Sequence, residues 1–429
     1  MDLIRTGLQN LDDARANLDR LKADGVSDER LVGMLKALSK ACDPDCALSN
    51  FVDITNAMQS QGRDFDAMVP DEAALERLIT VLGVSDEMGK LMRFRPELVE
   101  AAANDACESH LYNHEQRKAH VLKSVGADPN DHAMPTASLP LAEAATALRK
   151  TYRKQLAAIM AQDATANDPI EIQPRISTEL SDLADAALEG ALAIARHEVD
   201  GSEHVRFAII GMGKLGAQEL NYVSDVDLIY VVEPADMDTN GMTLSRIGTK
   251  MATTLQRVCQ SVIMGVAEPT LWQIDGGLRP EGKDGPLVRR LESHEAYYEQ
   301  WAENWEFQAL LKARPVAGDT DLGQAYMDMT RPFVWTASKR DNFVYDCQQM
   351  RKRVEDLIPN PLKDREIKLG RGGLRDVEFT VQMLQLVHGR SDEALRTSST
   401  LESLQALAEG GYVSRKQAKK LSWDYRFNV

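Results

Sequence analysis

Apolar residues recur at intervals of three and four along the first 200 residues, the spacing expected for one face of an α-helix. The pattern is clear in residues 11–25, 28–42 and 71–104. Residues 126–140 are rich in Pro, Asp and Asn, which predicts a loop. Two long helical patterns follow it, separated by the breakers N-D-P and Q-P-R around residues 167–175. These patterns predict a helical N-terminal region, residues 1–200.

The pattern changes near residue 203. Short apolar runs with β-branched and aromatic residues predict strands at VRFAII, VDLIYVV and TLWQID, and a helix is predicted over 243–264. Helical patterns return from about residue 291, over 293–314, 321–357, 377–389 and 398–422. The chain is therefore predicted to be mostly α with one small mixed β-sheet, formed by a core over 201–290 and followed by a helical region over 291–429.

The segment GMGKLGAQELNYVSDVDLIYVV, residues 211–232, carries the clearest chemistry. Asp225 and Asp227 stand two apart at the start of a predicted strand, so their side chains project from the same face. Paired carboxylates beside a phosphate-binding turn are typical of a divalent metal site that also contacts a nucleotide. A glycine turn brings backbone N–H groups close to phosphate oxygens. The segment thus indicates nucleotidyl transfer, with a phosphate cradle formed by Gly211, Gly213, Lys214, Gly216 and Ser224.

The same letters also spell G-x-G-x-x-G after an apolar run, with Glu233 about 20 residues further on, which is the dinucleotide-binding fingerprint. Two details favour nucleotidyl transfer instead. A crossover helix takes roughly 10–12 residues, and about nine separate Gly216 from Val226. In addition, the pair Asp225 and Asp227 at the start of the strand would have no role in binding NAD. A structural turn with incidental aspartates is the third interpretation.

A third carboxylate is expected from a neighbouring strand, because two divalent ions need more negative charge than one pair supplies. Asp275 ends the predicted strand TLWQID and precedes two glycines. Arg279 and Lys283 bring positive charge to the same loop. Considered alone, Asp275 fits a turn aspartate, and its place after a strand and before L-R-P favours the catalytic interpretation.

Four motifs in order carry a family resemblance: G-M-G-K-L-G-x-x-E-L-N-Y-x-S-D-x-D-L, D-x-x-L-R-P-x-G-x-x-G-P-L-V, W-E-x-x-A-L-L-K-A-R-x-V-A-G-D and I-K-L-G-R-G-G-L-R-D-V-E-F. The chain resembles the glutamine synthetase adenylyltransferase/adenylyl-removing enzymes. The resemblance implies a DNA-polymerase-β-like nucleotidyltransferase core that uses Mg²⁺ on Asp225, Asp227 and Asp275. It implies two such cores in a chain of about twice this length. One attaches AMP from ATP to a tyrosine of glutamine synthetase, the other removes it with phosphate to give ADP, and a PII signalling protein sets the balance.

The sequence holds one copy of these motifs and ends within a helical pattern, so a truncated chain is expected. Arg375 resembles the adenylyl-removing half, whereas Asp376 replaces the usual Glu and Ala217-Gln218 replaces Gly-Arg. We therefore expect removal of AMP by phosphorolysis. The alternatives are adenylylation by the same kind of site, a non-catalytic regulatory module that binds nucleotide, and an NAD oxidoreductase. Five cations of the motifs are expected to bind phosphate or nucleotide: Arg279, Lys312, Arg314, Lys368 and Arg375.

Composition limits the partners. A net charge of −16 argues against a nucleic-acid substrate. No apolar run approaches the ~18 residues of a membrane span. The five scattered cysteines fit reduced thiols in a cytoplasmic protein. His110 and His114 are four apart on a predicted helix, and their charged neighbours favour a solvated face.

Overall fold

The computed structural model describes residues 3–104, 113–236, 239–363 and 365–429. The chain forms two compact units: unit 1 comprises Met1–Asn113 and Lys150–Ile172, and unit 2 comprises His114–Arg149 and Gln173–Val429. The helices α9 (Leu141–Ala164) and α10 (Pro169–Glu198) contribute residues to both units. The division into segments 1–200, 201–290 and 291–429 stays a prediction.

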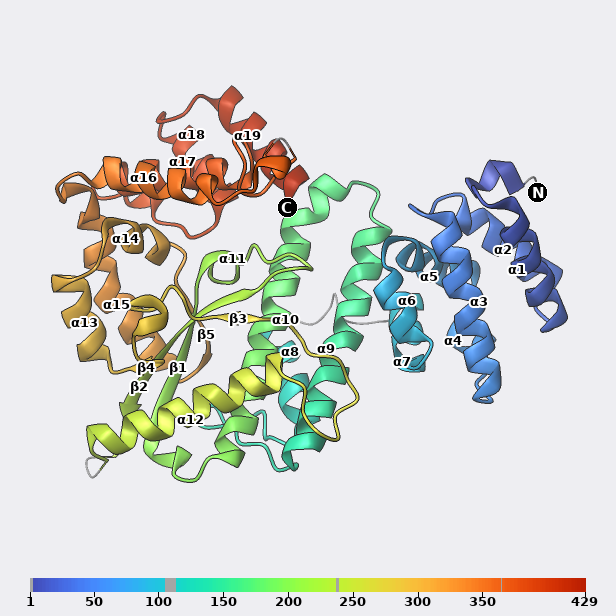
Figure 1. Ribbon diagram of the computed structural model, residues 1–429, viewed down its shortest axis with the longest axis horizontal. Coiled ribbons are helices and arrows are strands. Elements are labelled where there is room, and N and C mark those ends of the chain that lie inside the picture. Colours follow the sequence, from blue (N-terminus) through green and yellow to red (C-terminus); the bar gives the residue numbers. More distant parts are fainter. Residues whose placement is uncertain (1–2, 105–112, 237–238, 364) are drawn as a thin grey trace. The chain divides into compact units, whose positions relative to one another are not determined.

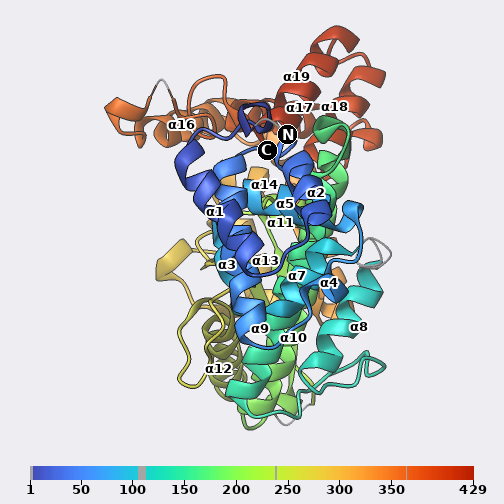
Figure 2. The same cartoon turned by 90° about the vertical axis from the view of Figure 1, so that its right-hand side faces the viewer.

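Unit 1 is helical, and its helices pack around their own core, coloured blue in Figure 2. Most of them begin where the sequence supplies a cap: the Asp43 side chain accepts from the Cys46 N–H with Pro44 in the first turn, and Asp71 accepts from the Ala74 N–H. Phe51, Met34 and Leu78 are among the fully buried side chains of the core. The helices are α1 (Leu11–Ala23), α2 (Asp28–Leu38), α3 (Pro44–Ser60), α4 (Phe65–Met68), α5 (Glu72–Val84), α6 (Asp86–Met92) and α7 (Pro96–Ala103).

Unit 2 holds the sheet and the remaining helices. In both views α17, α18 and α19, drawn in orange to red, lie together (Figures 1 and 2). The elements are α8 (His114–Ser124), β1 (Val205–Gly211), α11 (Gly213–Gly216), β2 (Val226–Pro234), α12 (Gly241–Gln260), β3 (Ile274–Asp275), β4 (Val288–Arg289), α13 (Leu291–Gln300), α14 (Asn304–Leu310), β5 (Arg314–Gly318), α15 (Thr320–Thr336), α16 (Phe343–Asp356), α17 (Leu374–His388), α18 (Thr400–Glu409) and α19 (Arg415–Asn428).

The sheet is small and mixed. Its strand order is β3-β2-β1-β5, with β4 also paired to β2. The strand β1 runs antiparallel to both β2 and β5, whereas β3 and β4 run parallel to β2. One face is covered by α13, α14 and α15, because Ala208, Ile210, Ile229 and Val231 pack in the same cluster as residues of these helices. On the other face α12 packs against β2.

The predicted fold class is confirmed: the chain is mostly helical with one small mixed sheet of five strands. The predicted loop over 126–140 and the helix near 243–264 are also present. Several details of the prediction were wrong. The helical stretches predicted over 293–314, 321–357 and 398–422 are each two helices, the last pair divided at Gly410-Gly411. Arg314, predicted to end the first of these stretches, begins the strand β5, and Pro174 lies inside α10.

The strand β5 and the helix α10 each have a physical cause. Pro315 has no N–H group, which suits the edge strand β5, paired with β1 alone and with a bulge at Ile209/Ile210. The helix α10 begins at Pro169, where the Asp168 side chain accepts from the Glu171 N–H. The helix continues through Pro174 and is buried along most of its length after it. Tertiary packing therefore outweighs the helix-breaking tendency of the proline.

Two further observations concern the whole chain. Among the described residues, none of the helices is both long and apolar enough to cross a membrane. The four described cysteines, Cys42, Cys46, Cys259 and Cys347, are free thiols, whereas Cys107 lies outside the described residues.

Candidate active site

Three carboxylates meet at one end of the sheet, and we call Asp225, Asp227 and Asp275 the aspartate cluster. Asp225 immediately precedes β2, and Asp227 is its second residue. The parallel pairing of β2 with β3 places Asp227 directly beside Asp275. Backbone register alone therefore brings together residues that are 48 positions apart in the sequence (275 minus 227).

The aspartate cluster carries unbalanced negative charge. The pKa of Asp227 is raised to about 6: burial is the largest cause, the carboxylates of Asp225 and Asp275 add to it, and Arg375 and Lys368 oppose it. Carboxylate oxygens are the donors that Mg²⁺ and similar hard cations prefer, and a divalent ion would relieve the repulsion between them. The donor set thus fits a divalent metal.

The glycine turn lies against the aspartate cluster. The Met212 N–H donates to the carbonyl oxygen of Asp227 over 2.9 Å, which ties the turn to β2. Gly213 has φ +54°, and a Cβ there would lie 2.6 Å from the Asp227 Oδ2. A Cβ on Gly216 would lie 1.8 Å from the carbonyl oxygen of Lys312. Side chains are therefore excluded at both positions, at Gly213 by the carboxylate and at Gly216 by the neighbouring backbone.

Three cations act on one another, and two of them also act on the aspartate cluster; we call Lys214, Lys368 and Arg375 the cation group. Arg375 and Lys368 both act on the pKa of Asp227. Burial lowers the pKa of Lys214, Glu378 opposes this, and Lys368, Lys312 and Arg375 lower the pKa further. The Arg375 side chain is 40% exposed and forms an ion pair with Glu378 over 3.0 Å. Positive charge from α11 and from the segment leading into α17 therefore converges on the same place.

Two other predicted cations lie in structural contacts. Lys312 is 5% exposed, and its Nζ lies 3.0 Å from Glu219 and 3.5 Å from Glu378. Arg314 forms an ion pair with Asp185 over 2.6 Å and donates to the carbonyl oxygens of Leu215 and Gly216. These contacts support the glycine turn and α17, and a role for either side chain in binding phosphate or nucleotide stays a prediction.

The remaining predicted residues shape the loops around the aspartates. The Ser224 Oγ donates to the carbonyl oxygen of Asp225 over 2.8 Å. Arg279 donates to the carbonyl oxygens of Gly276, Lys283 and Gly285, so it organises the loop that follows Asp275. Gly211 lies at the end of β1, beside Val316 of β5. These positions place Ser224, Arg279 and Gly211 next to the site, and a role in binding phosphate stays a prediction.

Sequence reasoning missed the residues that hold the cations in place. Glu219, Lys312, Glu378 and Tyr425 form a buried network, in which the Tyr425 hydroxyl donates to Glu219 over 3.0 Å and to Glu378 over 3.2 Å. Thr400 joins it through its Oγ, which donates to Glu219 over 2.9 Å. The sequence did mark two residues of this network, because Glu219 and Glu378 are glutamates within the motifs E-L-N-Y and R-D-V-E-F. Tyr425 carried no signal beyond a helical pattern.

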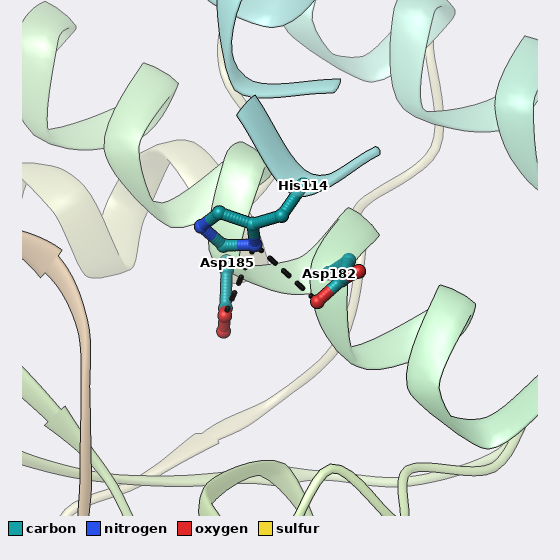
Figure 3. Close-up of side chains that lie close together, drawn as sticks. All are labelled: His114, Asp182 and Asp185. Atoms are coloured by element: carbon teal, nitrogen blue, oxygen red, sulfur yellow. Dashed lines mark hydrogen bonds and ion pairs between the residues drawn. The ribbon is translucent and has the colours of Figure 1, made fainter. Parts of the chain in front are cut away.

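The predicted solvated face around His114 is only partly solvated, because the His114 side chain is 39% exposed and lies beside two carboxylates. The His114 Nδ1 lies 3.3 Å from Asp182 and 3.9 Å from the fully buried Asp185, as Figure 3 shows. Ligand atoms of these three residues lie within 4.8 Å of one another. Arg314 forms an ion pair with Asp185 and donates to the carbonyl oxygen of Leu215 in the glycine turn. The cluster is therefore linked to the turn through Arg314. His110 lies outside the described residues.

The sheet excludes the dinucleotide-binding alternative. A crossover helix connects parallel strands, whereas β1 and β2 are antiparallel and the intervening helix α11 has four residues. Glu233 is also engaged, accepting from the Leu291 N–H over 2.9 Å and from Arg290 over 3.0 Å. The G-x-G-x-x-G segment therefore lies in the turn between two antiparallel strands, beside the carboxylates.

Comparisons with known proteins agree with this geometry. Residues 75–329 match the family model of glutamate-ammonia ligase adenylyltransferase, and residues 348–429 match that of GlnD PII-uridylyltransferase. The chain is 78% identical over 427 residues to the bifunctional glutamine synthetase adenylyltransferase/adenylyl-removing enzyme of Bifidobacterium longum strain DJO10A, covering 100% of the chain and 40% of the relative. The proteins of the same name from Cutibacterium acnes and Streptomyces avermitilis are 44% identical over 99% of the chain and 42% identical over 96% of it. The chain spans 42% and 38% of these two relatives.

Proposed function

Because the chain belongs to the glutamate-ammonia ligase adenylyltransferase family, we propose that unit 2 transfers an adenylyl group at the aspartate cluster. One observation carries the proposal: the carboxylates of Asp225, Asp227 and Asp275 and the cations Lys368 and Arg375, which come from three separate parts of the sequence, act on one another at the end of β2. Carboxylates beside cations fit a reaction in which a metal and a phosphate must be held together. The bifunctional names of the relatives support this reaction class for the whole protein.

In the proposed reaction the chain removes AMP from an adenylylated tyrosine of glutamine synthetase. An oxygen of inorganic phosphate bonds to the α-phosphorus, the bond from phosphorus to the tyrosine oxygen breaks, and the phosphate proton goes to the phenolate. The products are ADP and tyrosine. Arg375 supports this direction, because it is a partly exposed guanidinium beside Asp227 and would grip an attacking phosphate through two hydrogen bonds.

The chain's own groups would divide the work. Lys214 and Arg375 would neutralise the phosphate oxygens, and the tight turn at Gly213 would let backbone approach the α-phosphate. A metal held by the aspartate cluster would supply stabilisation of the charge that develops on the phosphoryl oxygens. The leaving tyrosine has a usual pKa near 10, so it can depart as a phenolate without a dedicated general acid.

The decisive experiment incubates the 429-residue chain with adenylylated glutamine synthetase and Mg²⁺, with and without inorganic phosphate. Formation of ADP only with phosphate is expected. If no ADP forms either with or without phosphate, the proposal is contradicted. Incorporation of AMP from ATP without phosphate would assign the chain to the opposite half-reaction, for which a site of the same kind is suited.

A second candidate function is a non-catalytic regulatory module. It is favoured by the match of residues 348–429 to a GlnD PII-uridylyltransferase model, which suggests a link to PII signalling. We propose glutamine synthetase as the protein substrate, a PII protein as regulator, and ATP, ADP and phosphate as small ligands. Nucleic acid and membrane partners are not proposed, and a cytoplasmic location stays a prediction.

A further inference from the structure

A cavity of about 190 Å³ opens beside the aspartate cluster. Gly213, Asp227 and Arg375 lie on its wall, so it is continuous with the proposed site of phosphoryl chemistry. Pockets for whole drug-sized ligands take about 300–1,000 Å³. This cavity is smaller and suits a single planar ring system rather than a complete nucleotide.

The cavity is walled mainly by apolar side chains from three helices. Trp305 of α14, Phe379 of α17, and Met350 and Val354 of α16 line it, and all four are half-buried. Aromatic and thioether side chains around a flat space are well suited to stacking on a heterocyclic base, which contributes roughly 1–3 kcal/mol per base. The wall therefore matches the face of a base rather than the charge of a phosphate.

One buried acceptor in this wall is unpaired. Gln308 is 3% exposed, and its Nε2 donates to the Gln382 Oε1 over 2.8 Å. The Gln308 Oε1 has no hydrogen-bond partner among the described residues. Leaving a buried acceptor unpaired costs about 1–3 kcal/mol, so an unpaired atom in a cavity wall calls for a ligand that donates to it.

We propose that this cavity binds the adenine ring of the adenylyl group, with the Gln308 Oε1 accepting a hydrogen bond from the exocyclic N6 amino group. The proposal rests on the proposed function. The helical positions support it, since Gln308 and Ala309 lie three and four residues after Trp305 on α14, and Arg375 and Gln382 are seven apart on α17. The helix α17 would thus face the base with Gln382 and the phosphate end of the site with Arg375.

The phenol ring of the adenylylated tyrosine is a poorer occupant. Its oxygen is bonded to phosphorus and has no proton to donate, so the Gln308 acceptor would stay unpaired. Adenine carries its donor at the edge of the ring. Hypoxanthine, which has an oxygen in place of the N6 amino group, would put an acceptor against the Gln308 acceptor.

The test compares ADP with inosine diphosphate, binding to the full 429-residue chain in the presence of Mg²⁺, by calorimetry. The wild type is expected to bind ADP at least about tenfold more tightly, since sites built around one hydrogen bond discriminate strongly against analogues that lack it. Gln308→Leu should raise the Kd for ADP about tenfold and change the Kd for inosine diphosphate less than threefold. The matched control is Gln324→Leu, an exposed glutamine on α15, which should leave both Kd values unchanged.

A second variant keeps the test decisive if Gln308→Leu does not fold. Trp305→Leu should weaken both nucleotides by a similar factor, because stacking does not distinguish the two bases. Equal affinity of the wild type for ADP and inosine diphosphate would overturn the proposal, as would an unchanged preference in a folded Gln308→Leu. Failure of the proposed function is separate: adenine preference without release of ADP from glutamine synthetase would leave the cavity assignment standing and the reaction wrong.

Discussion

The aspartate cluster and the cation group face each other, yet they are held in different ways. Asp227 and Asp275 are neighbours because two strands pair in register, and main-chain hydrogen bonds maintain that register. Arg375 is held by an ion pair with Glu378, which in turn depends on Lys312 and Tyr425. Substituting the aspartates should therefore lower activity without lowering stability. Substituting the residues that hold Arg375 in place should lower both.

The strongest test of this contrast is Asp227→Asn. Turnover should fall at least about 10³-fold, equivalent to about 4 kcal/mol in activation free energy. The melting temperature should stay the same or rise, since Asn removes the repulsion from Asp225 and Asp275 that raises the Asp227 pKa. ADP formation and thermal unfolding check both halves of this expectation. Asp341→Asn, at an exposed aspartate, is the matched control, and near-normal turnover in Asp227→Asn would end the metal-site assignment.

The next largest effect is expected for Glu219→Ala, in the buried network. Lys312 would lose its nearer carboxylate while remaining buried, and removing one partner of a buried pair costs about 3–5 kcal/mol. Tryptophan fluorescence during urea unfolding measures the loss in unit 2 alone, because all five tryptophans lie there: Trp272, Trp301, Trp305, Trp335 and Trp423. Glu409→Ala, at an exposed position, should cost little. Equal stability of both variants would show that the network contributes nothing.

The same contrast explains what the sequence could predict. Alternation within a strand and a carboxylate at the end of the next strand are local patterns, so the order of residues along the chain was enough to select Asp225, Asp227 and Asp275. The partners of Lys312 could not be selected in this way, because Glu219 and Glu378 reach it only after α17 has packed against the core. The strand β5 was missed for a related reason: five residues that contain a proline carry little local signal, and pairing with β1 decides their conformation.

A moderate effect is expected for Arg375→Lys. A single ammonium cannot reproduce the two parallel hydrogen bonds that a guanidinium donates to phosphate. The phosphate concentration that gives half-maximal rate should rise about tenfold, with a smaller change in the maximal rate. Phosphate titrations of ADP release measure this, with the exposed Arg353→Lys of α16 as control. A lower melting temperature with unaltered phosphate dependence would mean that Arg375 serves only its ion pair with Glu378.

The smallest expected effect is a loss of stability at acidic pH. Burial alone would raise the pKa of Glu378, but Lys312, Arg375 and Lys214 outweigh it and hold this pKa at about 2, below the usual 4.5. The carboxylate therefore contributes stability that is present above pH 4.5 and is lost as the pH falls towards 2. Relative to Glu378→Gln, the wild type should lose on the order of 1 kcal/mol of unfolding free energy between pH 7 and pH 4. Urea unfolding at the two pH values checks this, and a constant difference would contradict it.

The hydrogen bond between Tyr425 and Glu219 joins residues 206 positions apart. A contact of that separation closes a long loop, and such contacts form late because the chain entropy must be lost before the contact repays it. During synthesis the aspartates leave the ribosome well before α19 does. The newly made chain is therefore expected to pass through a stage in which Asp227 and Asp275 are paired across β2 and β3 while Lys368 and Arg375 are not yet in place. Activity of the proposed kind should begin as a final, cooperative step of folding.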